Sequence, residues 1–232
     1  MPRIPCPVIY EMFETGQAKD LQGQVHKFDQ GIHLSYAEAL YGAVLNMKPQ
    51  LIIEVGLACG TSSLAMLTAL KEIGQGGRVI SIDPGQSTYW HSCGVANIQR
   101  AGFAPQHRLI EDYDYNALPL LLKEGCKADF GYIDGWHTFD YALLDFFYID
   151  KMLKKGGAVA FNDSGYRAVL RVIRFVLGHR KYQEFDVGLP RTYTSKYPGG
   201  ALIKRLTGRS NPDRYFRKLE DWEPHFQFYA PF

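Results

Sequence analysis

The sequence lacks several features that each define a large class of proteins. Its 232 residues contain no apolar run of about 18 residues, so no membrane span and no membrane partner are predicted. The first residues show no apolar signal-peptide run. The four cysteines include no Cys-x-x-Cys pair and no Cys/His cluster with zinc spacing, which argues against a zinc site or a disulfide framework. These absences predict a cytoplasmic protein with reduced thiols.

A strong net charge is also missing. The chain has 26 Lys+Arg and 24 Asp+Glu, a formal net charge of +2, so a nucleic-acid partner is not expected. The charges are unevenly placed, however: residues 1–163 carry 13 basic and 18 acidic side chains, whereas residues 164–232 carry 13 and 6. We expect this basic excess to be solvated surface, with the alternative that it attracts an acceptor bearing phosphate or carboxylate.

What the sequence does contain is an alternation of short apolar runs and amphipathic segments. Runs rich in β-branched residues predict strands over 51–55, 78–82, 107–110, 128–133 and 158–161, with two more at 183–187 and 201–206. Helical spacing lies between them, over 35–47, 62–73, 90–101, 117–123, 139–153 and 168–177. The alternation predicts an α/β fold with a doubly wound, mostly parallel seven-stranded sheet and helices on both faces.

We predict a single domain over residues 1–232. It would comprise an N-terminal extension (1–32) of irregular or short helical structure, a core (33–206), and an aromatic and basic C-terminal tail (207–232). The tail is expected to pack on its own domain or, alternatively, to cover a neighbouring subunit of a homo-oligomer.

Parallel sheets bind ligands at the carboxyl ends of their strands, so the loops there matter most. The first is Glu54-Val-Gly56-Leu-Ala-Cys-Gly60-Thr61-Ser62. Its glycines allow a ligand to approach the backbone, Thr61 or Ser62 can cap the next helix, and Glu54 suits a cationic or amine-bearing ligand. The loop has neither G-x-G-x-x-G nor a P-loop pattern. A plain strand–turn–helix connection is the alternative.

The next two loops carry acidic groups. Asp83 ends the second predicted strand, where a carboxylate can accept hydrogen bonds from both hydroxyls of a ribose. Its alternative role is an ordinary Asp-Pro-Gly turn. Glu111-Asp112-Tyr113-Asp114 follows the third strand, in a position to hold an adenine amino group, and is otherwise only an acidic loop.

The fourth and fifth strands end in Asp134-Gly-Trp-His137 and Asn162-Asp163. These strands are neighbours in a doubly wound sheet, so Asp134 and Asp163 are expected to converge. Two carboxylates with an amide oxygen and waters suit Mg²⁺, and His137 is placed to act as general base on a bound hydroxyl. The alternative is that both aspartates are helix N-caps and that His137 is a surface histidine.

Together these segments resemble the class I S-adenosylmethionine-dependent methyltransferases, and more narrowly their macrocin-type and catechol-type small-molecule O-methyltransferases. The resemblance runs from about residue 33 to 206 and rests on four segments: Glu54–Ser62, Asp83, Tyr132–His137 and Asn162-Asp163. It implies that cofactor-binding groups lie at Glu54, Gly56, Gly60, Thr61, Ser62, Asp83, Asp112 and Tyr113.

The same resemblance implies metal ligands at Asp134, Asn162 and Asp163, and a catalytic role for His137. The macrocin-type enzymes have a catalytic histidine at this place and the catechol-type enzymes a lysine. One departure is Asn162, because the macrocin type carries Asp-Asp there; the change removes one formal charge from the proposed Mg²⁺ site.

The predicted function is therefore S-adenosylmethionine-dependent methyl transfer to a hydroxyl of a small molecule or sugar, assisted by Mg²⁺, with Asp134 and His137 as the catalytic residues. Two alternatives come from other classes. One is a nicotinamide-binding oxidoreductase with a similar sheet, which the missing third glycine disfavours. The other is a non-catalytic cofactor-binding or interaction protein, which Asn162 leaves open.

Overall fold

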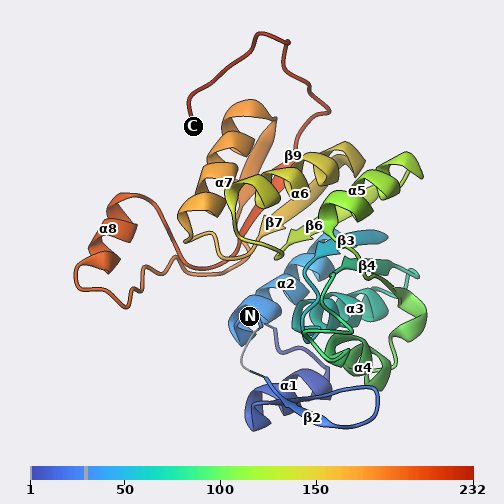
Figure 1. The fold of residues 1–232 in the computed structure, drawn as a ribbon. Coiled ribbons are helices and arrows are strands. Elements are labelled where there is room, and N and C mark those ends of the chain that lie inside the picture. The colour runs from blue at the N-terminus through green and yellow to red at the C-terminus, as the bar shows by residue number, and fades with distance from the viewer. Residues whose placement is uncertain (1, 29–30) are drawn as a thin grey trace.

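A computed structural model describes residues 2–28 and 31–232; residues 1, 29 and 30, which belong to the predicted N-terminal extension, lie outside the described residues. The predicted seven-stranded sheet is confirmed (Figure 1). Its strands are, in spatial order, β5 (His107–Ile110), β4 (Arg78–Ile82), β3 (Leu51–Val55), β6 (Ala128–Ile133), β7 (Leu153–Phe161), β9 (Arg214–Lys218) and β8 (Tyr182–Phe185). Strands β3 to β7 pair in parallel, and β9 runs antiparallel to both of its neighbours.

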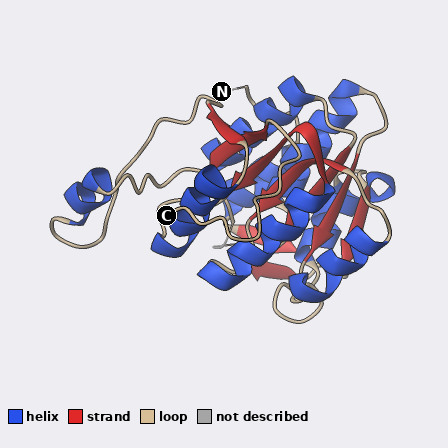
Figure 2. Cartoon of the chain, turned by 90° about the horizontal axis from the view of Figure 1, so that it is seen from above, coloured by secondary structure: helices blue, strands red, loops and turns tan. Residues whose placement is uncertain are grey.

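Helices cover both faces of this sheet (Figures 1 and 2). The three on one face are α2 (Leu34–Met47), α3 (Thr61–Ile73) and α4 (Cys93–Arg100), and the three on the other are α5 (Asp114–Lys123), α6 (Phe139–Met152) and α7 (Arg167–His179). Strand β3 is apolar apart from Glu54 because both of its faces are buried: Ile52 packs into the first layer and Ile53 into the second, and both are fully buried.

The N-terminal extension is more ordered than expected. It contains α1 (Pro7–Thr15) and a small hairpin of β1 (Gln17–Lys19) and β2 (Val25–Lys27). Ile9 and Met12 of α1 are fully buried in the same core as α2 and α3. This segment is therefore a part of the core and not an appendage to it.

The strand predicted over 201–206 is wrong. Those residues belong to helix α8 (Gly200–Leu206), in which Leu202 and Leu206 are one helical turn apart. The seventh strand is β9, inside the predicted tail; it inserts between β7 and β8 and buries Tyr215 toward one face of the sheet and Phe216 toward the other. The sheet thus extends beyond residue 206, where the core was expected to end.

The last residues pack on their own domain. The rings of Phe228 and Phe232 make edge contacts with His179 at the end of α7, with centroids 5.5 and 5.3 Å away. The backbone N–H of Ala230 donates to His179 Nε2 at 3.2 Å. Within residues 2–28 and 31–232, no helix is long and apolar enough to cross a bilayer.

Candidate functional site

The loops that follow β3 and β6 meet at the carboxyl edge of the sheet. Gly56 has φ +92, and a Cβ at this position would collide with the carbonyl oxygen of Asp134. Only glycine therefore fits here, because it tolerates both the positive φ and the close approach. This contact brings together the two predicted halves of the site: Asp134 and the loop Glu54–Ser62, which we call the cofactor loop after its predicted role.

Glu54 is enclosed beneath this loop. Its side chain is fully buried and accepts hydrogen bonds from the hydroxyls of Ser62 (2.5 Å), Ser63 and Ser81 (2.5 Å). We call these four residues the serine–glutamate cluster. Burial raises the pKa of Glu54 to about 7, although the serine hydrogen bonds oppose the shift. The carboxylate is thus directed into the protein, and the structure does not place it against an open ligand cavity.

Thr61 and Ser62 do not cap α3 as expected. The N-cap is Gly60, in a left-handed conformation with φ +86, and no side chain makes the capping hydrogen bond. Ser62 is held by Glu54 instead, and Thr61 Oγ1 is buried without a hydrogen-bond partner among the described atoms. The hydroxyl of Thr61 is therefore unused in this structure.

The Asp83 carboxylate holds the cofactor loop in place by hydrogen bonds. Its Oδ2 accepts the backbone N–H groups of Leu57 (3.0 Å) and Ala58 (2.8 Å), and its Oδ1 accepts that of Gly85 (2.8 Å). Gln86, which the sequence analysis missed, adds a second connection by donating to Asp83 Oδ2 and to the carbonyl of Ala58. The Asp83 carboxylate therefore closes the Asp-Pro-Gly turn and anchors the cofactor loop at the same time.

Asp112 and Tyr113 lie at the end of β5. Asp112 Oδ1 accepts the N–H of Tyr113 at 2.7 Å and the side-chain amide of Asn116 at 3.0 Å. The Tyr113 ring is half exposed and stacks on Tyr115, with centroids 5.0 Å apart. An exposed aromatic face next to a carboxylate is suited to a planar base.

The second group of polar residues lies at the ends of β6 and β7. His137 Nε2 lies 3.6 Å from Asp134 Oδ1 and 3.8 Å from Asp163 Oδ2. Both distances are too long for hydrogen bonds, and Nε2 is buried without a partner among the described atoms. We call Asp134, His137 and Asp163 the aspartate–histidine cluster. The predicted convergence of the two aspartates around His137 is therefore present in the structure.

The pKa values of all three side chains in this cluster are raised above their ordinary values. Burial raises the pKa of Asp134 to about 6 and also raises that of Asp163. Burial opposes protonation of His137, yet the two neighbouring carboxylates raise its pKa above the ordinary value. A proton acceptor between two carboxylates is stabilised once it becomes positively charged, which is a useful property for a general base.

Sequence reasoning missed a third carboxylate here, Asp213, which directly precedes β9. It is buried and accepts hydrogen bonds from Tyr132 OH (2.7 Å) and Asn162 Nδ2 (3.0 Å). Burial raises its pKa to about 8. No pattern in the sequence singles it out, because it becomes part of the site only through the insertion of β9.

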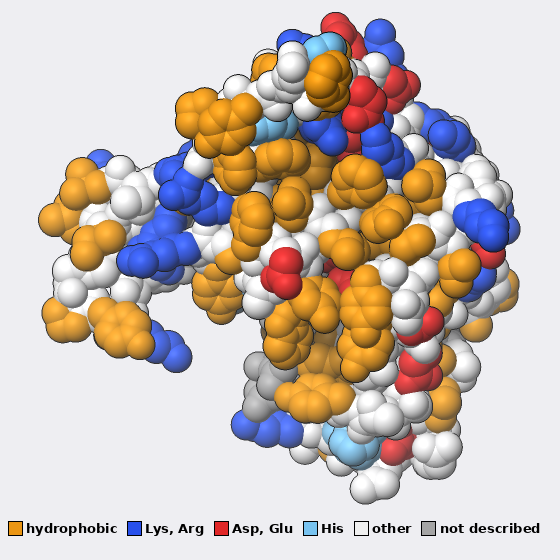
Figure 3. Space-filling view, turned by 45° about the horizontal axis from the view of Figure 1, so that its top comes forward, with side chains coloured by type: hydrophobic (Ala, Val, Ile, Leu, Met, Phe, Trp, Pro, Cys, Tyr) orange, Lys and Arg blue, Asp and Glu red, His pale blue; other side chains and the backbone are white. Residues whose placement is uncertain are grey.

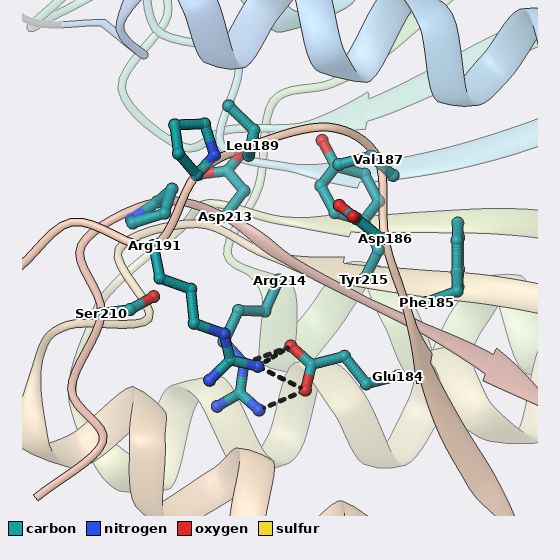
Figure 4. A pocket seen from close by; sticks show the side chains of 12 residues that line it. Glu184, Phe185, Asp186, Val187, Leu189, Arg191, Ser210, Asp213, Arg214 and Tyr215 are labelled. Carbon is teal, nitrogen blue, oxygen red and sulfur yellow. Dashed lines mark hydrogen bonds and ion pairs between the residues drawn. The ribbon is translucent and has the colours of Figure 1, made fainter.

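A cavity of about 500 Å³ opens beside Asp213, between the residues that follow β8 and the start of β9 (Figure 4). Its wall is partly apolar, with Leu189 and Tyr215, and partly charged. Glu184 accepts two hydrogen bonds of 2.7 Å from Arg214, and Arg191 bonds to the same carboxylate. The cavity thus combines apolar surface with a fixed ionic cluster, as small-molecule sites commonly do.

The predicted metal ligands are not arranged as a metal site. Asn162 donates its side-chain N–H to Asp213, and His137 lies between the two aspartates. Within the described ranges, no group of three or more His, Cys, Asp or Glu side chains could hold a metal ion. The donor set as folded therefore does not fit a bound divalent cation.

Comparison with known proteins supports the fold and finds a methyltransferase-like domain in part of the chain. Residues 53–164 match the family profile described as a methyltransferase domain. This part of the chain, a little under half of its length, is similar to methyltransferase domains. The matched range contains the cofactor loop, Asp83 and the aspartate–histidine cluster, which favours a methyltransferase over the nicotinamide-binding alternative.

Relatives and solved structures agree with this assignment. A caffeoyl-CoA O-methyltransferase-like protein of Arabidopsis thaliana is 30% identical over 122 residues, and the match spans 51% of this chain and about half (48%) of that relative. An O-methyltransferase of Bacillus cereus, solved with S-adenosylhomocysteine, has a TM-score of 0.68 at 13% identity, covering 90% of this chain and 89% of its own. TomG of Streptomyces achromogenes, solved with S-adenosylmethionine, has a TM-score of 0.65 at 16% identity and 83% coverage of both chains. At these identities the solved structures support the fold alone.

Proposed function

We propose that this methyltransferase transfers the methyl group of S-adenosylmethionine to a hydroxyl oxygen of a small molecule or sugar in the cytoplasm, with His137 as general base. The observation that carries the proposal is the position of His137 Nε2, buried, unpartnered among the described atoms and between two carboxylates at the carboxyl edge of the sheet. The names of these three relatives, all O-methyltransferases, support oxygen as the acceptor atom.

In the proposed reaction the acceptor oxygen attacks the sulfonium methyl in line. A carbon–oxygen bond forms, the carbon–sulfur bond breaks with its electrons going to sulfur, and the hydroxyl proton passes to His137 Nε2. Asp134 and Asp163 stabilise the imidazolium that results. Alignment of the reacting atoms by the rigid loops supplies much of the remaining acceleration.

The cofactor would lie along the loops after β3, β4 and β5. We assign the methionine part to the Gly56–Ser62 loop, the ribose to Asp83 and the adenine to Asp112 and the exposed face of Tyr113. Glu54 would act indirectly by holding Ser62 and Ser63 in place. The acceptor would enter from the cavity beside Asp213, whose carboxylate accepts a hydrogen bond from Asn162, the chain neighbour of Asp163.

We assign no step of this reaction to a divalent cation, because Asp134, Asn162 and Asp163 do not fit one as folded. Addition of EDTA to the purified protein is expected to leave turnover within about twofold, since the proton is taken by a side chain. Loss of turnover with EDTA and its recovery with Mg²⁺ would contradict this part of the proposal.

The proposal is tested with His137→Ala and a matched control, His225→Ala, at an exposed histidine of the tail. His137→Ala is expected to lower methyl transfer by about a hundredfold or more, with S-adenosylhomocysteine binding and the unfolding midpoint unchanged. His225→Ala should behave as the wild type. Thermal stabilisation by NAD in place of S-adenosylhomocysteine would instead support an oxidoreductase, and cofactor binding without turnover on a hydroxyl panel would support a non-catalytic role.

A further inference from the structure

A segment between β8 and β9 extends away from the rest of the molecule (Figures 1 and 2). We call residues 187–212, with α8 at the tip, the arm. Its two limbs are tied together near the base: the N–H of Asn211 donates to the carbonyl of Thr192 at 2.8 Å, and the side-chain amide of Asn211 donates to Thr194 Oγ1 at 2.9 Å. Lys204 also donates to Asn211 Oδ1, at 3.1 Å. The two limbs of the arm are thus held to each other by hydrogen bonds.

The tip of the arm is apolar and exposed. The exposed fractions are 80% for Tyr197, 62% for Leu202, 51% for Ile203 and 78% for Leu206. Isolated exposed apolar residues are common on protein surfaces, but a contiguous group on one short projection is characteristic of an interaction surface. In Figure 3, orange hydrophobic side chains gather at the end of the projection.

All of the charged side chains in the arm are basic. Residues 187–212 contain five lysines and arginines and no aspartate or glutamate: Arg191, Lys196, Lys204, Arg205 and Arg209. The basic surface continues onto α7, where Arg174 donates to the carbonyl of Thr207 at 3.2 Å. In Figure 3, most of the blue side chains on the projection lie between its tip and the body of the molecule. Much of the basic excess of residues 164–232 is therefore gathered on and beside this projection.

The sequence predicts no membrane partner because it has no membrane span, but surface docking needs no span. We propose that the arm docks the protein on the surface of an anionic lipid bilayer. Apolar side chains flanked by lysine and arginine are the combination that binds such an interface, because the apolar groups enter the headgroup region while the cations contact anionic headgroups. The acceptor, cofactor and metal assignments above play no part in this inference.

Two other occupants fit less well. A nucleic acid would satisfy the cations but would leave Leu202 and Leu206 exposed to water. A second copy of the chain would need an interface of about 800 Å² on each partner, and four side chains on a seven-residue helix and its flank do not supply that area. A bilayer imposes no such minimum, and it complements both the charge and the apolar tip.

Docking in this way would have a geometric consequence. The base of the arm runs directly into Asp213 and β9, beside the cavity that Asp213 lines. A protein held by the arm would therefore carry this edge of its sheet close to the membrane surface. The acidic residues 1–163, which carry 18 acidic and 13 basic side chains, would favour an orientation away from the anionic headgroups.

The test is flotation of the full-length protein with vesicles of phosphatidylcholine alone, or with about a third of phosphatidylglycerol. The protein should float with the anionic vesicles only, and less so when NaCl rises from about 0.1 to 0.5 M. Lys196→Gln with Arg205→Gln removes two exposed cations and should lower the partition coefficient about thirtyfold. Leu202→Ser with Leu206→Ser should also abolish flotation.

A matched control carries Leu120→Ser with Arg108→Gln, at positions that are 55% and 58% exposed and lie outside the arm. It should float as the wild type does. All variants should keep the wild-type unfolding midpoint, since the altered side chains are exposed. Absence of flotation, or flotation that the arm variants leave unchanged, would overturn the proposal. So would a dimer, seen by light scattering, that Leu202→Ser with Leu206→Ser dissociates, because the arm would then bind a second copy.

Discussion

Two polar clusters lie at the same edge of the sheet and differ in whether their buried side-chain atoms are hydrogen-bonded. In the serine–glutamate cluster, Glu54 accepts three hydroxyl hydrogen bonds at close range. In the aspartate–histidine cluster, Nε2 of His137 has carboxylates at 3.6 and 3.8 Å and no hydrogen bond to a described atom. A satisfied buried group positions the backbone around it, whereas an unsatisfied one is available to a substrate. We therefore expect changes in the first cluster to affect stability and changes in the second to affect turnover.

The largest expected effect is that of Gly56→Ala, because this substitution would disturb both clusters at once. The added methyl group would meet the Asp134 carbonyl, and φ +92 would be strained. We expect a loss of about 3 kcal/mol in the free energy of unfolding, together with loss of turnover because Asp134 is displaced. Urea denaturation and a methyl-transfer assay on the same preparation measure both. Normal stability would show that the two loops can separate at little cost.

The next effect is that of Glu54→Ala. It removes the acceptor shared by Ser62, Ser63 and Ser81 and leaves their hydroxyls buried. We expect the free energy of unfolding to fall by about 2 kcal/mol and turnover of the folded fraction to change far less. Thr68→Val provides a control in α3, the helix that holds Ser62 and Ser63. The Thr68 hydroxyl donates to the carbonyl of Leu64 and makes no contact with Glu54 among the hydrogen bonds described. Retained stability with a lost reaction would place Glu54 in the chemistry instead.

A buried acid outside both clusters tests whether an unsatisfied group always indicates function. Asp145 of α6 is fully buried, and neither of its carboxylate oxygens is hydrogen-bonded to a described atom. Burial raises its pKa well above the ordinary value, with a further contribution from the Asp114 carboxylate. The folded state therefore binds this proton more tightly than the unfolded state does. Stability should fall as pH rises from about 4 toward the folded pKa.

Asp145→Asn removes this ionisation. We expect it to raise the free energy of unfolding by about 1–2 kcal/mol at pH 8, to have little effect near pH 4, and to leave turnover within about twofold. Denaturant titrations at the two pH values measure the difference. A variant that lost turnover at unchanged stability would show that Asp145 belongs to the reaction.

The smallest expected effect is that of Tyr113→Ala. If the half-exposed ring is the surface on which the adenine stacks, its removal should weaken S-adenosylhomocysteine binding about fivefold to tenfold and leave stability unchanged. Isothermal titration calorimetry measures the change, with Tyr229→Ala of the exposed tail as the control. Unchanged affinity would assign the adenine to another loop.

The sequence was sufficient for the parallel part of the sheet and for the loops at its edge. Strands such as Leu51–Val55 are short and rich in apolar, β-branched residues because both of their faces are buried, so their pattern is distinct. The strand Arg214–Lys218 was not predictable in this way, since it has only two adjacent apolar residues between charged ones. Asp213 and Gln86 were missed for a related reason: their importance comes from contacts with distant residues, Tyr132 and Ala58, which no local spacing encodes.

The central claim is that the aspartate–histidine cluster is maintained for the reaction at the expense of stability, and Asp134→Asn tests it most directly. Burial raises the pKa of Asp134 to about 6, so at neutral pH the carboxyl is ionised but its ionisation costs more free energy in the folded protein than in the unfolded chain. We predict that Asp134→Asn raises the free energy of unfolding at pH 7.5 by about 1 kcal/mol and lowers methyl transfer by about a hundredfold. A variant that is less stable than the wild type and still transfers methyl groups at the normal rate would contradict the claim.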